Sequence, residues 1–547
     1  MVNKRVFLGP LAALLTAATV GCGQGVAASS AASKAVGSGH GGILNIATQT
    51  DVPSLDPAIG VDSESSQFVK AIFAGLVQWA PTAVKIMPDL ASSWKWDKAG
   101  TSVTFHLRKA EFSNGAPVTA QDVKFTFERV LNPKTGAFLT SPFMDIAGAD
   151  TFAAGHASSV SGIVVVNPTT VQFNLVKPEP YFLDALAAGT GGIMDPAVVH
   201  KYGKNISQHP VGAGPFELQK WTPGQELVLV RNPHYYNPSL PKLSEIVLKI
   251  GLTASQQFEA FQQGKLDIIG ADLTGSGTVD PNTYLSVLAN PKLKKDLIKE
   301  PIFEVYGLFP NAEYKPLANQ DVRDAIMYAI DRKHLVQIAN GVATVSNQLL
   351  PPGLFGYDKN LPQIPLNLAK AKALLKAGHY NPKTVIHLVT TNDPFSVAIC
   401  TAIQADLAKI GMKIVLEPQA VSTYLNTLAN PKLVQISYSF WQAEFPDPQD
   451  FLYNMFSSKT YGLFNASYWS TPQVDALLNA ADTSTNAALR IKDYTKVQKL
   501  VMQGGAEIPL FNGEMDELVQ PNLGPTNNPM YFLHTVDGIQ FAYIYKK

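Results

Sequence analysis

The chain has 547 residues, of which 46% are hydrophobic and 16% charged, and its formal net charge is zero. This length exceeds one ordinary core and predicts two or three domains, and the composition is that of a folded protein rather than a disordered one. A neutral charge balance argues against a dedicated nucleic-acid binder, which needs a basic face.

The N-terminal residues have the pattern of an export signal. Lys4 and Arg5 precede an apolar run over residues 6–20 that is too short to span a bilayer, and small residues follow it up to Cys22. This pattern resembles a bacterial lipoprotein signal, in which the cysteine becomes the lipidated first residue of the mature chain. Thr19 departs from it, because leucine is usual there. An ordinary signal peptide with an incidental cysteine is the alternative.

The next segment predicts a tether and not a domain. Residues 23–40 are rich in Gly, Ala and Ser and have almost no large apolar side chain. Cys400 is the only other cysteine and lies in an apolar helical pattern, so we expect it to be buried and expect no disulfide in the mature body. No second stretch of the sequence suits a transmembrane helix. The mature protein is therefore expected to be exported, anchored at one end and otherwise soluble.

Alternating apolar residues predict the first strands of the body. Leu44 and Ile46 share one face of a short strand near its start. Residues 101–107 repeat this pattern with Val103 and Phe105 on one face. Both stretches therefore predict strands with one buried face.

Helices are predicted further along by capping residues and by helical spacing. Thr119 and Asp122 have the spacing of a capping box and predict a helix that begins there. Residues 319–336 are predicted to form one amphipathic helix, with Val322 and Ile326 on the buried face.

The C-terminal half contains the clearest strand–helix–strand unit. Residues 384–391 and 413–418 read as strands on either side of a helix, and such crossovers build a parallel sheet. Residues 434–445 also read as a strand that runs out into a loop, with Glu444 at its end. Because ligands bind at the carboxyl ends of strands in open α/β sheets, Glu444 is expected to face a cleft. The predicted fold class is α/β with more than one sheet.

The sequence lacks the common catalytic and metal-binding motifs. We find no HExxH, no P-loop, no G-x-S-x-G elbow and no histidine pair at metal-ligand spacing. No catalytic residue, metal or cofactor is therefore predicted. Residues 239–242 match S-x-x-K and residues 134–136 match K-T-G, as in penicillin-binding enzymes, but their order is reversed and Pro241 disrupts the required helical turn.

One pair of carboxylates leaves a hydrolase open as an alternative. Glu444 and Asp447 could act as an acid/base pair, as in glycosidases. Prolines flank Asp447 on both sides, which favours a turn role for that residue.

Several stretches together resemble the family 5 extracellular solute-binding proteins of ABC importers, the dipeptide- and oligopeptide-binding type. They run in the family's order and cover nearly the whole mature chain. The most specific is TFHLRKAEFSNGAPVTAQDVKFTFERV at residues 104–130. The others are GGILNIA…SLDPA (41–58), IFAGLV (72–77), PDLASSW (88–94), PVGAGPF (210–216), RNPHYY (231–236), FEAFQQGKLDI (258–268), VRDAIMYAIDR (322–332), AKALLKAG (371–378), IQADLAKIGM (403–412) and WQAEFPDPQDFL (441–452).

The resemblance implies a two-lobed periplasmic-binding-protein type II clamshell with a third domain inserted in the first lobe. Family boundaries place the first lobe at 41–75, 209–302 and 509–547, the inserted domain at 76–208 and the second lobe at 303–508. Ligand would be trapped by hinge closure and delivered to an ABC permease with its ATPase. The protein itself would be a monomeric receptor and not an enzyme.

The resemblance also implies a ligand site around Glu444. In peptide-binding members an aspartate at this position pairs with the peptide's α-ammonium group, and a cleft that closes over a cation needs such a partner. The strand from Phe440 to Gln442 would pair with the ligand backbone, and Trp441 and Phe445 would supply apolar walls. The alternatives are a solvated loop carboxylate for Glu444 and simple core packing for the two aromatic residues.

Two departures from the family bear on the ligand. Glu444 is one methylene longer than the family's aspartate. Dipeptide binders carry an arginine in the loop that here contains Asn392 and Asp393, and Asp393 would repel a peptide's C-terminus and could attract a second cation. A longer peptide with an unclamped C-terminus, or a cationic small solute, therefore remains open.

A second candidate region follows the first strand. Thr50 and Asp51 stand where family members face ligand, and a turn-capping role for Asp51 is the alternative. Other solutes within the family, such as a metal chelate, an oligosaccharide or an opine-like compound, remain open, as does a secreted lipoprotein hydrolase from a different class.

Overall fold

The computed structural model describes residues 41–547 except 82, 271–280, 340–341, 525–534 and 536. The described residues belong to one compact unit, which spans residues 40–547. The lipidation candidate Cys22 and the tether at 23–40 lie outside the described residues. Within the described part, no helix has the length and apolar character needed to cross a membrane.

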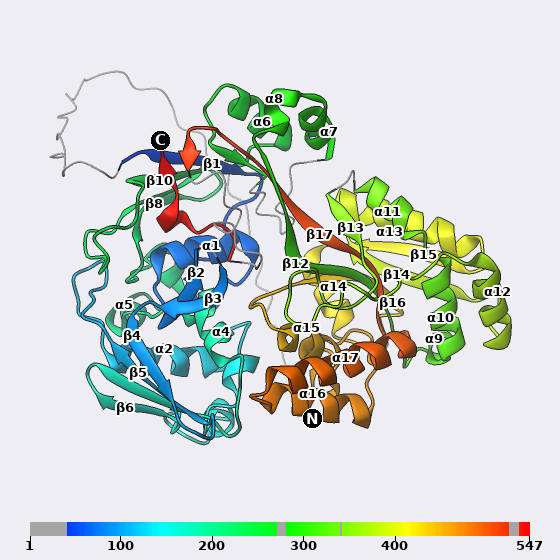
Figure 1. The fold of residues 1–547 in the computed structure, drawn as a ribbon, viewed down its shortest axis with the longest axis horizontal. Coiled ribbons are helices and arrows are strands. Elements are labelled where there is room, and N and C mark those ends of the chain that lie inside the picture. The colour runs from blue at the N-terminus through cyan, green and yellow to red at the C-terminus, as the bar shows by residue number, and fades with distance from the viewer. Residues whose placement is uncertain (1–40, 82, 271–280, 340–341, 525–534, 536) are drawn as a thin grey trace, which may run out of the picture. The chain divides into compact units, whose positions relative to one another are not determined.

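The first sheet has four strands in the order β1-β10-β9-β8 (Figure 1). β1 (Ile43–Thr48) pairs in parallel with β10, and the other pairs are antiparallel. Leu44 and Ile46 point into a core that also receives α1, so the predicted alternation is confirmed. The other elements of this part are α1 (Ser63–Ile72), β8 (Phe216–Thr222), β9 (Glu226–Arg231), β10 (Glu245–Ile250), α6 (Ala254–Gln262), β18 (Leu523–Gly524), η6 (Phe541–Tyr543) and β19 (Tyr545–Lys546).

A second, antiparallel sheet has the order β4-β5-β7-β6 and its own aromatic core (Figure 1). The predicted capping box is present, because Asp122 accepts from the backbone of Thr119 and α2 (Ala120–Leu131) begins there. The neighbouring elements are β2 (Val77–Ala80), β3 (Ala83–Pro88), β4 (Ala91–Trp96), β5 (Ser102–Leu107), η1 (Ser141–Phe143), α3 (Ala149–Ala153), β6 (Ile163–Asn167), β7 (Thr170–Asn174), α4 (Phe182–Ala187), η2 (Gly189–Gly191), α5 (Pro196–Tyr202) and η3 (Gly203–Gln208).

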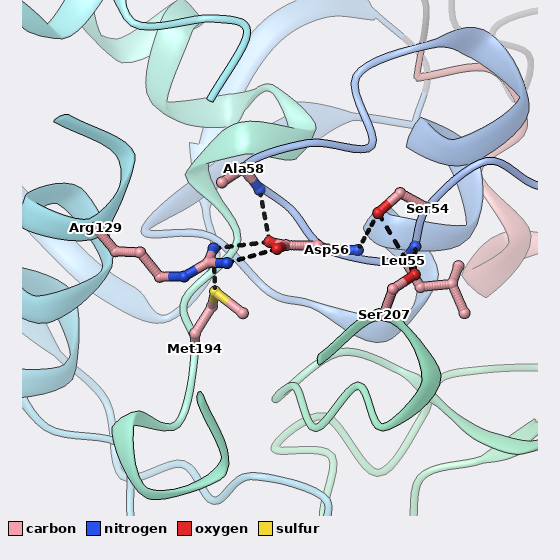
Figure 2. A network of polar contacts seen from close by, with 7 residues as sticks. All are labelled: Ser54, Leu55, Asp56, Ala58, Arg129, Met194 and Ser207. Carbon is pink, nitrogen blue, oxygen red and sulfur yellow. Dashed lines mark hydrogen bonds and ion pairs between the residues drawn. The ribbon is translucent and has the colours of Figure 1, made fainter. Parts of the chain in front are cut away.

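A buried ion pair joins the loop after β1 to α2 (Figure 2). The two terminal guanidinium nitrogens of Arg129, Nη1 and Nη2, donate to Asp56 at 2.7 and 2.5 Å. The backbone of Ala58 donates to the same carboxylate, and the Ser207 hydroxyl accepts from the backbone of Leu55. Such a bidentate pair fixes orientation as well as distance, so the first strand's loop is held firmly against the second sheet's helix.

The third sheet has seven strands, with the main order β11-β17-β12-β16-β14-β15 and β13 paired to β17. β14 (Val385–Thr391), α13 (Pro394–Ala408) and β15 (Lys413–Gln419) form the predicted unit, and the two strands are parallel as expected. Cys400 is fully buried in α13, as predicted. The remaining elements are β11 (Ile268–Ile269), α7 (Pro281–Ala289), α8 (Pro291–Lys294), β12 (Leu297–Pro310), α9 (Lys315–Ala318), β13 (Ala343–Val345), α12 (Leu368–Ala377), α14 (Val421–Leu428), β16 (Ile436–Gln442), α15 (Pro448–Phe456), η4 (Ser458–Thr460), α16 (Pro472–Thr483), α17 (Ala487–Gly504) and β17 (Ile508–Val519).

Two long strands, β12 and β17, run from one core into another (Figure 1). Ile302 and Met515 belong to the core of the first sheet, whereas Leu308 and Leu510 belong to the core of the seven-stranded sheet. Their pairing is irregular between Pro301 and Val305. The part of the chain built on the first sheet and the part built on the seven-stranded sheet, called the two bodies below, are therefore connected through a pair of extended strands.

The single helix predicted over residues 319–336 is wrong. The structure has two helices, α10 (Gln320–Ala329) and α11 (Arg332–Ile338), with extended backbone at Ile330. Asp331 caps the second helix by accepting from the backbone of His334 at 3.1 Å. An N-cap aspartate favours a new helix start. The apolar pattern continues across the break because both helices pack their apolar residues into the same core.

Candidate functional site

The strand that leads to Glu444 has one open edge. β16 pairs with β12 along residues 436–442. On its other side it pairs with β14 only through Ile436 and Ser437. Among the described residues, positions 439–442 therefore have no strand partner on that side. Unpaired backbone groups at such an edge are a template for an added strand.

Glu444 lies two residues beyond β16, at a junction between two cores. Ala443 packs in the core beneath β16 and α15, whereas Phe445 packs in the core of the second sheet. The ring of Phe445 stacks on Tyr181 with centroids 5.9 Å apart. The chain thus crosses from one hydrophobic core to another, and Glu444 occupies the crossing point.

The carboxylate of Glu444 is buried and has no partner among the described residues. It is 7% exposed, and no described residue donates a hydrogen bond to it or forms an ion pair with it. Burial raises its pKa well above the usual range, and the negative charges of Asp450, Asp537 and Asp62 raise that pKa further. A buried carboxylate in this state favours a proton or an added cation.

Asp450 holds the turn that carries Glu444. Its Oδ2 accepts from the Trp441 indole at 3.0 Å and from the backbone of Glu444 at 2.9 Å, and Asn454 donates to its Oδ1. Asp450 is fully buried, which raises its pKa to about 7. These bonds fix the backbone of Glu444 while leaving its side chain unbonded within the described residues.

Asp447 has a structural role, as its flanking prolines indicate. It caps α15 by accepting from the backbone of Gln449, and it forms a buried ion pair with Arg490 at 2.7 Å. Both contacts are made by Oδ1 of Asp447 and serve the local structure. The acid/base pairing of Glu444 with Asp447 gains no support from this arrangement.

The four aromatic and polar candidates beside Glu444 divide into two groups. Phe445 is buried in a core, in line with the packing alternative, and Trp441 is half-buried and packs against another core. Phe440, on the opposite face of β16, is 42% exposed and lies against Tyr306 with centroids 5.1 Å apart. Gln442 is half-buried at the strand's end.

The loop after β14 uses its acidic residue as a helix cap. Asp393 accepts from the backbone of Ser396 at 2.8 Å and from the hydroxyl of Thr391 at 2.7 Å. The backbone of the exposed Asn392 donates to Gln419. Asp393 is exposed, and its geometry is that of an N-cap.

Asp51 is tied to a neighbouring loop. It accepts from the Trp221 indole at 3.0 Å and from the backbones of Val52 and Gly224. The bonds of Asp51 agree with the turn-capping alternative. Thr50, which precedes it, is exposed.

Two carboxylates near Glu444 went unpredicted. Asp62 caps α1. Asp537, near the C-terminus, accepts a hydrogen bond from Ser66 of the same helix. Both are far from Glu444 in sequence, and neither stands in a recognisable motif. Within the described ranges, no group of three or more His, Cys, Asp or Glu side chains has an arrangement suited to a metal ion.

The family model for bacterial extracellular solute-binding proteins, family 5 Middle, matches residues 85–462. The chain belongs to this family. This chain is 31% identical over 482 residues to the probable D,D-dipeptide-binding periplasmic protein DdpA of Escherichia coli K12. The match covers 86% of this chain and 88% of that protein. It is 27% identical over 554 residues to the oligopeptide-binding protein OppA of Bacillus subtilis 168, covering 97% and 99%.

Solved structures give the same fold. The E. coli murein tripeptide binding protein MppA has a TM-score of 0.79 at 24% identity and covers 92% of this family 5 chain and 98% of its own. Haemophilus influenzae OppA, in complex with RPPGFSPFR, has a TM-score of 0.77 at 20% identity, covering 93% and 99%. The fold is therefore the type II periplasmic-binding-protein fold with several domains, as the resemblance implied.

Proposed function

We propose that this chain captures a peptide through its α-ammonium group by hinge closure and delivers it to an ABC permease. The observation that carries this proposal is Glu444, a buried carboxylate at the junction of two cores to which no residue of the described part of the chain donates. An uncompensated charge there is costly. A bound ammonium group would supply the missing partner.

The open edge of β16 supports a peptide rather than a compact solute. A peptide backbone can add to residues 439–442 as a further strand, as in other cases of strand addition. Phe440 stays exposed on one face of this edge. Peptide ligands are also named for the relatives DdpA and OppA.

β12 and β17 suit the role of hinge. They are the long strands that connect the core of the first sheet with the core of the seven-stranded sheet, whose strand β16 leads to Glu444. On this proposal the first lobe (41–75, 209–302, 509–547) and the second lobe (303–508) close on the ligand, and the inserted domain (76–208) follows the first lobe. Domain closure of this kind traps a ligand without chemistry, so we propose a monomeric receptor with no enzymatic step.

We further propose that the chain is exported and lipid-anchored through Cys22. The basic n-region, the apolar run and the Gly/Ala/Ser-rich tether support this. An anchor would keep the receptor close to its membrane permease and raise the local concentration of the pair. Globomycin, which inhibits lipoprotein signal cleavage, should leave the precursor uncleaved; a Cys22→Ser protein should leave the membrane fraction.

The test of peptide capture compares wild type with Glu444→Gln. Calorimetric titration of the body lacking residues 1–40 with pooled di- to hexapeptides should show binding by wild type and a loss of about 2–5 kcal/mol in the variant, because a buried charge loses its partner. Glu313→Gln, an exposed carboxylate elsewhere, serves as the matched control and should bind as wild type does. If no peptide binds wild type, the peptide function is wrong.

A further inference from the structure

Two aromatic side chains of the inserted domain contact the part of the chain that carries Glu444. Tyr181 lies between β7 and α4 and stacks on Phe445, with ring centroids 5.9 Å apart and an interplanar angle of 12°. Phe138 lies in the loop after α2 and meets Phe464 edge to face, with centroids 5.7 Å apart at 74°. Both partners lie far along the chain, so these ring pairs join two separate parts of the protein.

The first ring pair acts directly beside Glu444. Phe445 follows Glu444 in the chain and is fully buried in the core of the second sheet, together with Tyr181. The backbone oxygen of Phe445 accepts from the backbone of Asp447 at 2.8 Å, which keeps the turn compact. Withdrawing the turn from the inserted domain would return a large apolar ring to water. The Phe445 ring therefore favours the state in which the two parts touch.

The second ring pair reaches the same turn by another route. Phe464 packs on Trp441, with ring centroids 5.2 Å apart at 80°. The Trp441 indole donates to Asp450 Oδ2, and the backbone of Glu444 donates to the same oxygen. The contact between Phe138 and Phe464 thus bears on the residues that fix the backbone of Glu444.

The loop that carries Phe138 is fixed by its own hydrogen bonds. The K-T-G match at residues 134–136 begins in a turn, in which the backbone of Thr135 donates to the backbone oxygen of Asn132 at 2.9 Å. The backbone of Phe138 donates to the oxygen of Ala58 at 3.3 Å. The Phe138 side chain is nevertheless 50% exposed. A ring presented in this way on a fixed loop suits a contact that can form and break.

The inserted domain is bound to the first lobe by polar bonds. Arg129 of α2 pairs with Asp56 (Figure 2), and Lys70 of α1 donates to the backbone oxygen of Ala187 at 2.6 Å. Charge-assisted bonds of this kind fix orientation. On the hinge motion proposed above, the inserted domain therefore moves with the first lobe, and its two ring pairs form when the lobes close.

We propose that Phe138 and Tyr181 form a latch that holds the Glu444 turn in the closed form and so sets how long a bound peptide is retained. This inference rests on the proposed function. Contacts that exist only in the closed form shift the equilibrium toward it. They slow opening more than they affect the first encounter with ligand, because contacts of this kind act chiefly on dissociation. Both side chains are positioning residues, which act through Phe445 and Phe464.

The test follows release of peptide from wild type and from Phe138→Ala. The body lacking residues 1–40 is loaded with pooled di- to hexapeptides that carry a C-terminal fluorophore, which leaves the α-ammonium group free, and is then mixed with excess unlabelled pool. Truncation of a half-exposed ring should leave the fold intact. Phe138→Tyr keeps the ring and should restore wild-type release. Val166→Ala, at an exposed apolar residue of β6, is the matched control.

Hydrogen exchange provides a second readout that needs no peptide. The backbone amides of residues 441–446 should exchange faster in Phe138→Ala than in wild type, because the latch limits opening of the turn. The amides of β14, residues 385–391, should keep the wild-type rate. Equal acceleration of both segments would indicate general destabilisation and would overturn this inference.

We expect Phe138→Ala to release the labelled pool about three- to tenfold faster than wild type, the effect of losing one aromatic pair, with an unchanged association rate. Phe464→Ala should act in the same direction, and the double variant should release peptide at the rate of Phe464→Ala alone, because both changes break one contact. Release at the wild-type rate by Phe138→Ala would overturn this inference and leave the proposed function standing. If wild type binds no peptide, the proposed function is wrong; unchanged exchange at residues 441–446 would then overturn the latch as well, whereas faster exchange there would support it.

Discussion

Arg490 is predicted to be the most stability-critical cation beside the candidate site. Its Nη2 lies 2.7 Å from Asp447 Oδ1 and 3.1 Å from the Tyr494 hydroxyl, and its Nε donates to the backbone oxygen of Ala481. Arg490 is 6% exposed and Asp447 is 5% exposed. The pair joins α17 to the start of α15, directly after the turn that carries Glu444.

Arg490→Met removes this charge while keeping most of the side-chain volume. Removing one partner of a buried ion pair costs about 3–5 kcal/mol, because the other charge stays buried without compensation. The neighbouring carboxyls add to the penalty. Burial raises the pKa of Asp482 to about 7 and that of Asp184 to about 8, and the Arg490 charge limits both shifts. We therefore expect a loss of about 3–5 kcal/mol in the free energy of unfolding at neutral pH.

Urea denaturation followed by tryptophan fluorescence measures this loss. Lys492→Met, an exposed cation on the same helix, should stay within about 0.5 kcal/mol of wild type. The double variant Arg490→Met/Asp447→Asn should be more stable than Arg490→Met alone, because the uncompensated charge is gone. A loss below about 1 kcal/mol in Arg490→Met, or a double variant that is less stable than the single one, would refute this reasoning.

Two further changes probe the connecting strands. Gly513→Ala would place a Cβ 2.2 Å from Glu304 Oε2, so we expect a loss of about 1–3 kcal/mol in urea denaturation, whereas Gly41→Ala, with no atom within 4 Å, should be neutral. Burial raises the pKa of Glu304 from 4.5 to about 8. Because the folded state binds this proton more tightly, the stability contributed by Glu304 should fall by about 1.4 kcal/mol per pH unit between those values. Glu304→Gln should reduce that slope across pH 5–8, and an unchanged slope would contradict the assignment.

The parts of the fold that could be predicted are those set by local patterns. The strand–helix–strand unit over residues 384–418 follows from alternation and helical spacing, and the capping box at Thr119 marks a helix start without tertiary information. The break at Ile330 does not follow from the pattern, and the cap that Asp331 supplies to the second helix is seen in the structure. The apolar periodicity across the break favoured a single helix.

The candidate site was only partly accessible from the sequence. Glu444 could be placed at a strand end, because β16 is a local element. Whether Trp441 and Phe445 face a ligand or a core depends on which part of the chain covers each face; Phe445 is buried in a core, whereas Trp441 is half-buried and packs against one. Asp62 and Asp537 raise the pKa of Glu444 by their negative charge although both are distant from it in sequence, so no periodicity or motif could indicate them.

The buried carboxyls of this protein occur in two settings, and the difference bears on function. Glu304, Glu507 and Glu517 lie on or beside the long strands β12 and β17, where burial raises the pKa of each. Glu444 instead lies where the chain crosses between two cores, and no described residue donates to its carboxylate. Water can hydrate this carboxylate when the lobes are apart, but closure removes that water and leaves the charge dependent on a proton or a cation. A neutral ligand cannot replace the lost hydration, so closure over it should be less favourable than closure over an ammonium group. Selectivity for charge would then arise from the closing step itself, because the same burial that destabilises the empty closed form stabilises the occupied one.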